Sequence, residues 1–362
     1  MKTGDRLLSL DFFRGLTMFL LIAEFAHIFP YLLAPEVEGT LLWKLGQQLH
    51  HCEWAGLHFW DLIQPFFMFI VGVAMPYSFK NRRARGSSEK DIFKHVIIRS
   101  ILLLFIGWAL YCIGPGKIVF RFQNVLAQLG ITYFMAWLII NKKAWFQILF
   151  TLLLLLITEG FYRFFPLEGF NEAFVPGKNF GAWFNILIDG REDPGHWAMF
   201  NAIPTAAHTI WGVLVGKLLL NSKPAYDKIK TLLIAAVVLL VVGYATSLAT
   251  PIIKRISTSS FVLVSGGYTL LVMTLCYWII DILKLRKGVW LFSIIGMNPL
   301  FIYLFSHVGG AKLVRQIVFP FTSGLTGWIS EWFAGLFTGL VTLALLWGIC
   351  YWLYRKKIFI RI

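Results

Sequence analysis

"LHHCEWAGLHFWDLIQPFFMFIVG", residues 49–72, runs from a polar segment straight into an apolar one. Its second half is rich in Phe, Ile and Val, which is typical of a helix that dissolves in lipid. Its first half places His51, Trp54, His58 and Asp61 three, four and three residues apart. If a helix begins early in the stretch, this spacing puts the four side chains on one face. The stretch therefore predicts a membrane span whose polar stripe lines a wet cavity.

The composition of the whole chain also indicates a membrane protein. Of its 362 residues 58% are hydrophobic and 14% are charged, whereas about a quarter of the residues of a soluble domain are charged. We expect one all-α, multi-pass membrane domain over residues 1–362, with a re-entrant or interfacial piece at 309–332, where Pro320, Gly324 and Gly327 interrupt the apolar pattern. We expect about ten transmembrane helices, near 8–33, 57–80, 92–113, 118–140, 144–165, 199–220, 229–249, 260–283, 289–308 and 333–354.

The positive charges predict the orientation of these spans. Most Lys and Arg residues fall in the loops that are cytoplasmic if both termini are cytoplasmic, which is the arrangement that membrane insertion favours. The net charge of +15 then follows from topology and requires no nucleic-acid partner. We expect a protein of the bacterial inner membrane, in contact with the lipid bilayer, with His51 on the outer side.

Histidine is the side chain best suited to take a proton near neutral pH, so His51 is a candidate catalytic base. Two plainer interpretations stay open: His51 as an ordinary loop residue, and Asp61 as a buried carboxylate that pairs with an arginine for packing. The four cysteines have no metal-binding spacing, and we expect no metal. A bridge between Cys52 and Cys112 also stays open.

Six motifs follow one another along nearly the whole chain. They are RLLSLDFFRGLT at 6–17, HCEWAGLHFWDLIQPFFMFIVGVAM at 51–75, RFQNVLAQLGITYF at 121–134, DPGHWAMFNAIPT at 193–205, PIIKRISTSSFVL at 251–263 and GMNPLFIY at 296–303. In this order they resemble the membrane domain of the heparan-α-glucosaminide N-acetyltransferase family and its bacterial relatives of unassigned function.

The resemblance implies an enzyme that moves acetyl from cytosolic acetyl-CoA to the amine of a glucosamine-type sugar, or of a glycan terminus, beyond the membrane. It places the active-site histidine at His51 rather than His50. It carries the family's other functional positions onto Asp11, Arg14, Asp61, Arg121, Lys254 and Asn298. Where the family has an asparagine near Phe25, Glu24 is the nearest polar residue, and Gln128 and Ile253 also depart from the family pattern.

From the chemistry of this reaction we assign candidate roles. Asp61 and Glu24 are candidates to orient His51 in catalysis. Arg14, Arg99 and Asn298 are candidates to bind the co-substrate acetyl-CoA, since arginine pairs well with phosphate. A simple pair between Asp11 and Arg14 is the competing interpretation of that motif. The candidate sugar-binding residues are Trp54, His58, Arg121, Lys254 and Asp193.

Two other functions stay open. A permease for a cell-wall amino sugar needs the same polar cavity but neither acetyl-CoA nor His51. An O-acyltransferase that acts on a hydroxyl of an envelope glycan keeps the donor and changes the acceptor. A homodimer is a further open prediction.

Overall fold

The computed structural model describes residues 7–360 and 362, and within these it is all-helical with no β-strand. The prediction of an all-α protein is confirmed. By its internal contacts the described chain forms two compact units. Unit 1 joins the N-terminal part up to His51 with residues 58–60 and the part from Cys276 onward, and unit 2 holds residues 52–57, 61–275 and Ile362. One domain over 1–362 stays a prediction, because compact units need not fold separately.

Unit 2 is a bundle around helices α3 and α8, which pack against each other over much of their lengths. The pair α4 and α5 and the helix α6 pack beside them. Polar caps begin several of these helices, among them Ser88, whose hydroxyl and whose partner Asp91 form a reciprocal capping box at the start of α4. The helices are α3 Ile63–Ala84, α4 Glu89–Ile113, α5 Val125–Ile139, α6 Ala144–Arg163, α7 Phe180–Asp189, α8 Ala202–Leu220, α9 Ala225–Ser247 and α10 Ser259–Cys276.

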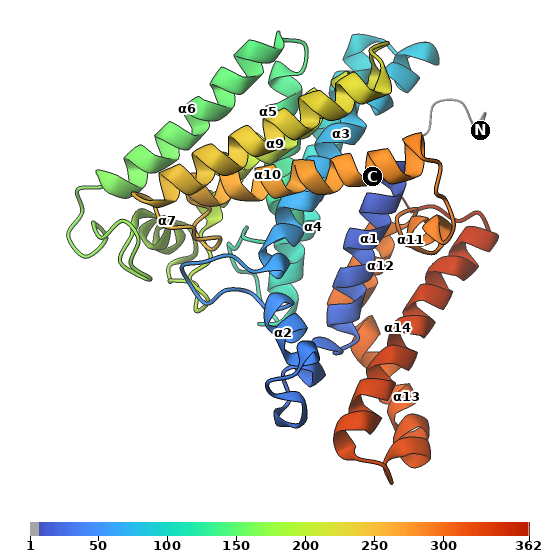
Figure 1. Ribbon diagram of the computed structural model, residues 1–362. Helices are drawn as coiled ribbons and strands as arrows, with labels where there is room; N and C mark the ends of the chain where they lie inside the picture. The colour runs from blue at the N-terminus through green and yellow to red at the C-terminus, as the bar shows by residue number, and fades with distance from the viewer. Residues whose placement is uncertain (1–6, 361) are drawn as a thin grey trace. The chain divides into compact units, whose positions relative to one another are not determined.

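Unit 1 is built around helix α1, which packs against α11 and α12, while α13 and α14 lie side by side (Figure 1). Phe292 of α11 fills the space between Phe12 and Phe19 of α1, with ring centroids 5.2 and 5.3 Å away. The chain enters this unit from α10 through a π-helix at Tyr277–Ile282. The α-helices of the unit are α1 Leu8–Phe25, α2 Leu41–Gln48, α11 Val289–Ile295, α12 Pro299–His307, α13 Gly310–Thr326 and α14 Glu331–Arg355.

Seven helices of the described chain are long and apolar enough to cross a membrane, or eight if the bent pair α11 and α12 is one span. The expected span at 289–308 is this pair, bent by 66°. The expected spans at 8–33 and 118–140 are shorter than predicted: α1 has 18 residues and α5 has 15. The expected re-entrant piece at 309–332 contains one 17-residue helix, α13. Ten spans stay a prediction.

The predicted helical stripe from His51 to Asp61 is wrong. Residues 51–58 form no helix, and a 3₁₀ turn at Phe59–Leu62 precedes α3. Gly56, in a positive-φ conformation at 134°, donates its N–H to Ile252 O at 2.8 Å. The backbone of this segment thus forms a hydrogen bond with a distant loop and not with its own helical turn. The helical spacing of His51, Trp54, His58 and Asp61 therefore does not place their side chains on one face.

Glycines set the close approach of α3 and α8. A Cβ atom built on Gly212 would stand 2.2 Å from Phe69 O, and one on Gly72 would stand 2.0 Å from Thr209 O. Small residues at such crossings let two helix backbones approach, which is the main way helices associate in lipid. These two positions therefore fix the centre of unit 2.

We predict that Gly212→Ala destabilises the protein, because the added methyl group meets backbone that cannot give way. Overpacking of this kind costs about 1–3 kcal/mol. Gly160→Ala on α6 is the matched control, since a Cβ there has no neighbour within 4 Å. Thermal unfolding in detergent measures both variants. Equal unfolding temperatures for the two would contradict this account of the α3 and α8 crossing.

Candidate functional site

A buried ion pair connects the start of the α3 region with the loop after α9. Asp61 is 1% exposed, and its Oδ1 lies 3.7 Å from Lys254 Nζ. The Cys52 N–H donates to the other carboxylate oxygen at 3.3 Å. Asp61 was expected as a possible partner of an arginine. The structure pairs it instead with Lys254, and so brings together two residues predicted separately for the site.

The loop 251–258 holds Lys254 in place through its own backbone and hydroxyl groups. The Thr258 hydroxyl donates to Pro251 O at 2.8 Å and accepts the Ile253 N–H at 3.0 Å. Ile253 also forms an isolated antiparallel bridge with Ala55. The loop that carries Lys254 is therefore held by hydrogen bonds within itself and by its bridge to Ala55.

Trp197 lies beside the cations of this loop. Lys254 Nζ and Arg255 Cζ are 5.5 and 5.4 Å from its ring centroid, within the range of cation–π attraction. Arg255 also donates to Gly195 O at 2.6 Å. Asp193 Oδ1 accepts the N–H groups of Gly195 and Trp197 at 2.9 and 3.2 Å. Asp193, predicted to bind sugar, thus shapes the turn that presents Trp197.

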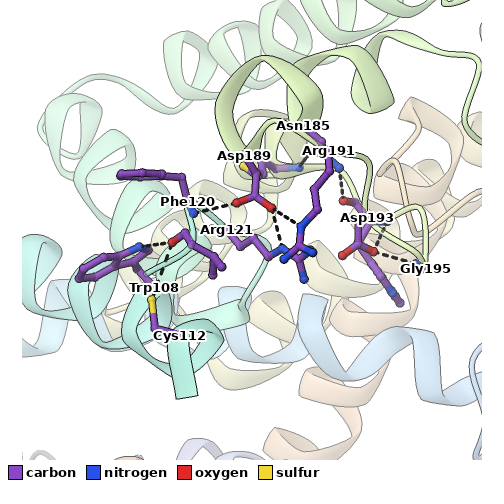
Figure 2. Close-up of polar contacts among 12 residues, drawn as sticks. Trp108, Cys112, Phe120, Arg121, Asn185, Asp189, Arg191, Asp193 and Gly195 are labelled. Atoms are coloured by element: carbon purple, nitrogen blue, oxygen red, sulfur yellow. Dashed lines mark hydrogen bonds and ion pairs between the residues drawn. The ribbon is translucent and has the colours of Figure 1, made fainter. Parts of the chain in front are cut away.

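A second ion pair holds the same polar region (Figure 2). Arg121 donates from Nε to Asp189 Oδ2 at 2.8 Å, Arg191 reaches the same oxygen at 3.2 Å, and the Phe120 N–H reaches Oδ1 at 2.9 Å. Burial raises the pKa of Asp189, but these hydrogen bonds outweigh burial and hold the pKa below its ordinary value of 3.8. Arg121 is therefore positioned by a carboxylate, and this partner was not predicted for it.

Trp54, in the segment before α3, contacts His196, in the segment before α8. The Trp54 indole donates to Phe174 O at 2.7 Å, and its ring lies edge-on to His196 at 6.0 Å between centroids. His196 Nδ1 contacts the carboxylate of Glu192. His196 and Arg255 were not predicted, although Arg255 is the direct neighbour of the predicted residue Lys254.

A basic cluster lies in the first half of α4 and on the helices next to it. An Arg82 N–H donates to His95 Nε2 at 2.9 Å, and the Arg99 guanidinium stands 4.9 Å from the Tyr133 ring centroid. Arg99 Nε is buried with no hydrogen-bond partner among the described residues. His95 and Arg99 are four residues apart on one helix face, a spacing that predicts their proximity. Arg99 was predicted, whereas Arg82 and His95 were not.

The other predicted residues belong to unit 1. Arg14 and Asp11 form the simple pair, at 3.7 Å. His58 Nδ1 lies 3.0 Å from His50 O, and Glu24 is in the last turn of α1. His51 ends this part of unit 1 and is joined by its peptide bond to Cys52 of unit 2.

Asn298 has a structural task in unit 1. It is fully buried, its amide N–H donates to Ile358 O at 2.9 Å, and its carbonyl accepts the Ile360 N–H at 2.9 Å. These two bonds hold the segment that follows α14. The contact of Asn298 with acetyl-CoA stays a prediction.

All four cysteines are free thiols, so Cys52 and Cys112 form no bridge in this structure. The Cys52 thiol donates to Ala55 O at 3.3 Å, and burial raises its pKa above the ordinary value. Within residues 7–360 and 362 no three His, Cys, Asp or Glu side chains come together as a metal site.

We predict that Arg121→Met lowers the free energy of unfolding by about 1.5–3 kcal/mol, because it removes a charge-assisted hydrogen bond and leaves the Asp189 carboxylate to Arg191 and the Phe120 N–H. Arg191→Gln is the matched control: Arg191 is half exposed on the same carboxylate oxygen, and such a pair contributes about 0–1 kcal/mol. Since the pKa of Asp189 is lowered, its stabilisation is complete above its ordinary pKa and is lost as the pH falls through the folded-state value. Thermal unfolding at neutral and acidic pH measures both effects. Similar losses for the two variants would contradict the assignment of Arg121 as the main partner.

No family model matches the chain. Two curated proteins do. The heparan-alpha-glucosaminide N-acetyltransferase of Mus musculus is 25% identical over 430 aligned positions, which cover 100% of this chain and 61% of the relative. The protein of the same name from Homo sapiens is 26% identical over 425 positions, which cover 99% and 60%. The chain thus spans about three fifths of the length of both relatives. This similarity confirms the resemblance that the motifs indicate.

Proposed function

We propose that this protein is a transmembrane N-acetyltransferase that moves acetyl from acetyl-CoA to the amine of a glucosamine-type sugar. The observation that carries the proposal is similarity along the entire chain to two proteins named as N-acetyltransferases. The buried pair of Asp61 and Lys254 supports it, because a charged pair within an apolar bundle is costly and typically marks a functional site.

His51 is the proposed catalytic residue. An amino sugar arrives largely as an ammonium and must lose a proton before its nitrogen attacks the thioester carbonyl. In direct transfer His51 takes that proton, the new C–N bond forms, the C–S bond breaks, and CoA leaves as the thiol after protonation. In relay transfer the imidazole nitrogen first accepts the acetyl group and releases CoA, and the amine then takes the acetyl from it. Asp61 and Glu24 are the proposed orienting carboxylates.

The proposed acceptor site lies around Trp197 and its neighbouring charges. Asp61 balances the charge of Lys254, whereas Arg255 has no carboxylate partner among the described residues. The Asp193 carboxylate next to Trp197 accepts the N–H groups of Gly195 and Trp197, so the positive charge of Arg255 is the one beside this aromatic face without an ion pair among the described residues. A sugar that carries an anionic neighbour, such as a glycan terminus with a carboxylate or sulfate, suits this charge better than an isolated ammonium sugar.

The donor is proposed to enter from the other end of α4. Arg99 and Ile113 are 14 residues apart on this helix, which corresponds to about 21 Å at 1.5 Å per residue. The pantetheine arm spans roughly 15–18 Å, comparable to five extended residues. Phosphates bound at Arg99, with Arg82 and His95 beside it, would therefore bring the thioester to within about 3–6 Å of the level of Ile113. Arg14 is the second proposed phosphate contact.

The proposed topology puts both termini in the cytoplasm of a bacterial cell, with His51 facing the periplasm. The distribution of Lys and Arg supports it. The cytosolic acetyl-CoA pool and the external sugar would then approach from opposite sides of the inner membrane.

We predict that His51→Ala abolishes measurable acetyl transfer, whereas His50→Ala keeps most of it. Loss of a general base costs about 10²- to 10⁴-fold in rate, and loss of a covalent relay costs more. His50 is the matched control because it is the adjacent, chemically identical side chain. Its Nδ1 lies 3.0 Å from Gly46 O, within hydrogen-bond distance.

The two variants are compared in detergent at matched concentration with labelled acetyl-CoA and glucosamine. Thermal shift with acetyl-CoA confirms that each is folded and binds the donor. A dead His50→Ala, or normal turnover by His51→Ala, would refute the assigned mechanism.

A further inference from the structure

Unit 1 contains a cavity at the end where α1 begins and α14 ends. Its volume is about 440 Å³, within the range of small-molecule binding pockets. Most of its wall is apolar: Leu8 of α1, Val289 and Ile294 of α11, and Met297 line it. Tyr354 of α14 closes one side. The cavity thus offers a floor for a hydrocarbon chain rather than for a polar group.

Two side chains of the wall, Ser293 and Arg286, have unused hydrogen-bonding capacity. The Ser293 hydroxyl is buried with no hydrogen-bond partner among the described residues, so it meets a ligand in the cavity by rotating about its Cα–Cβ bond. A buried hydroxyl without a partner carries a desolvation cost that a bound acceptor removes. Arg286 also lines the cavity, and the one hydrogen bond of its side chain within the described residues is a long one, 3.5 Å from Nε to Ile280 O. Its terminal nitrogens have no hydrogen-bond partner among those residues and can pair with an anion.

The mouth of the cavity has the composition of a membrane–water interface. Arg286 lies between Lys284 and Lys287 in the chain, and all three are exposed. Trp290, which lines the cavity, is 54% exposed. Amphipathic aromatic rings beside basic residues are typical of the headgroup level of a bilayer. Basic residues there attract anionic lipids.

We propose that this cavity binds one anionic glycerophospholipid. Its phosphate pairs with Arg286, an ester carbonyl accepts the Ser293 hydroxyl, and an acyl chain lies along Val289, Ile294 and Met297. From the mouth inward, the cavity has a charged group, then a hydrogen-bond donor, then apolar side chains. A glycerophospholipid has its phosphate, ester and acyl chain in the same order. A CoA nucleotide fits less well, because its polar base and ribose would face the apolar side chains of the wall.

Native mass spectrometry of the delipidated full-length protein tests the proposal. Phosphatidylglycerol and diacylglycerol with identical acyl chains are titrated separately, and CoA and inorganic phosphate are added as competitors. We expect one phosphatidylglycerol to bind at least tenfold more tightly than diacylglycerol, which lacks the phosphate, since a contact to a charged group is worth about that factor. Neither competitor should displace it.

Three variants separate the contacts. Arg286→Gln should bring the affinity for phosphatidylglycerol down to that for diacylglycerol, leaving the latter unchanged. Ser293→Ala should weaken both lipids, because both carry the ester carbonyl. Lys312→Gln, an exposed cation on α13, is the matched control and should change neither. Equal binding of the two lipids by the wild type, an unchanged preference in Arg286→Gln, or displacement by CoA would overturn the proposal.

Discussion

The polar region of unit 2 depends on one buried ion pair, between Asp61 and Lys254. Both side chains are almost entirely removed from solvent, and the Coulomb attraction between them has to offset the loss of hydration of two charges. Removing either partner would take this ion pair away from the other charge at a site that is closed to solvent. The chain around them is arranged accordingly: the Cys52 N–H stabilises the carboxylate, and the loop 251–258 is braced by its own hydroxyl groups.

The same principle extends to the last residue of α7, Asp189, and to the loop that follows it. Asp189 gathers two arginines and a backbone N–H, while Asp193 turns the chain so that Trp197 lies beside Lys254 and Arg255. Most of these charged and aromatic side chains contact at least one residue from a distant part of the sequence. The result is a preorganised set of charges next to an aromatic face, which suits recognition of a charged sugar better than the packing of lipid-facing helices.

Hydrophobic composition was sufficient to predict an all-α membrane protein and to place most helices, because long apolar runs have few alternatives in lipid. It failed at the start of α3. There Gly56 binds Ile252 across the fold, and a periodic pattern contains no information about such long-range backbone pairing. The bend between α11 and α12 was missed for a related reason: both halves are apolar, so the sequence reads as one span.

The candidate site was predictable in part. Asp61 and Lys254 were each selected by motif, but their pairing joins positions 193 residues apart in the chain, and only the folded structure brings them together. Asn298 shows the converse. Its motif suggested a ligand contact, whereas its amide group holds the C-terminal segment. A polar residue in a motif can be required for folding as well as for chemistry, and sequence alone does not separate the two.

Acetyl transfer across a sealed membrane tests the central claim most directly. The purified protein is reconstituted in liposomes with acetyl-labelled CoA trapped inside, and glucosamine or a glucosamine-terminated glycan with an adjacent carboxylate is supplied outside. The account predicts labelled N-acetyl sugar in the outer solution of vesicles with outward-facing His51, and none when the trapped donor is CoA without acetyl. Uptake of unmodified sugar into the vesicles, with no labelled product on either side, would contradict it and identify a permease.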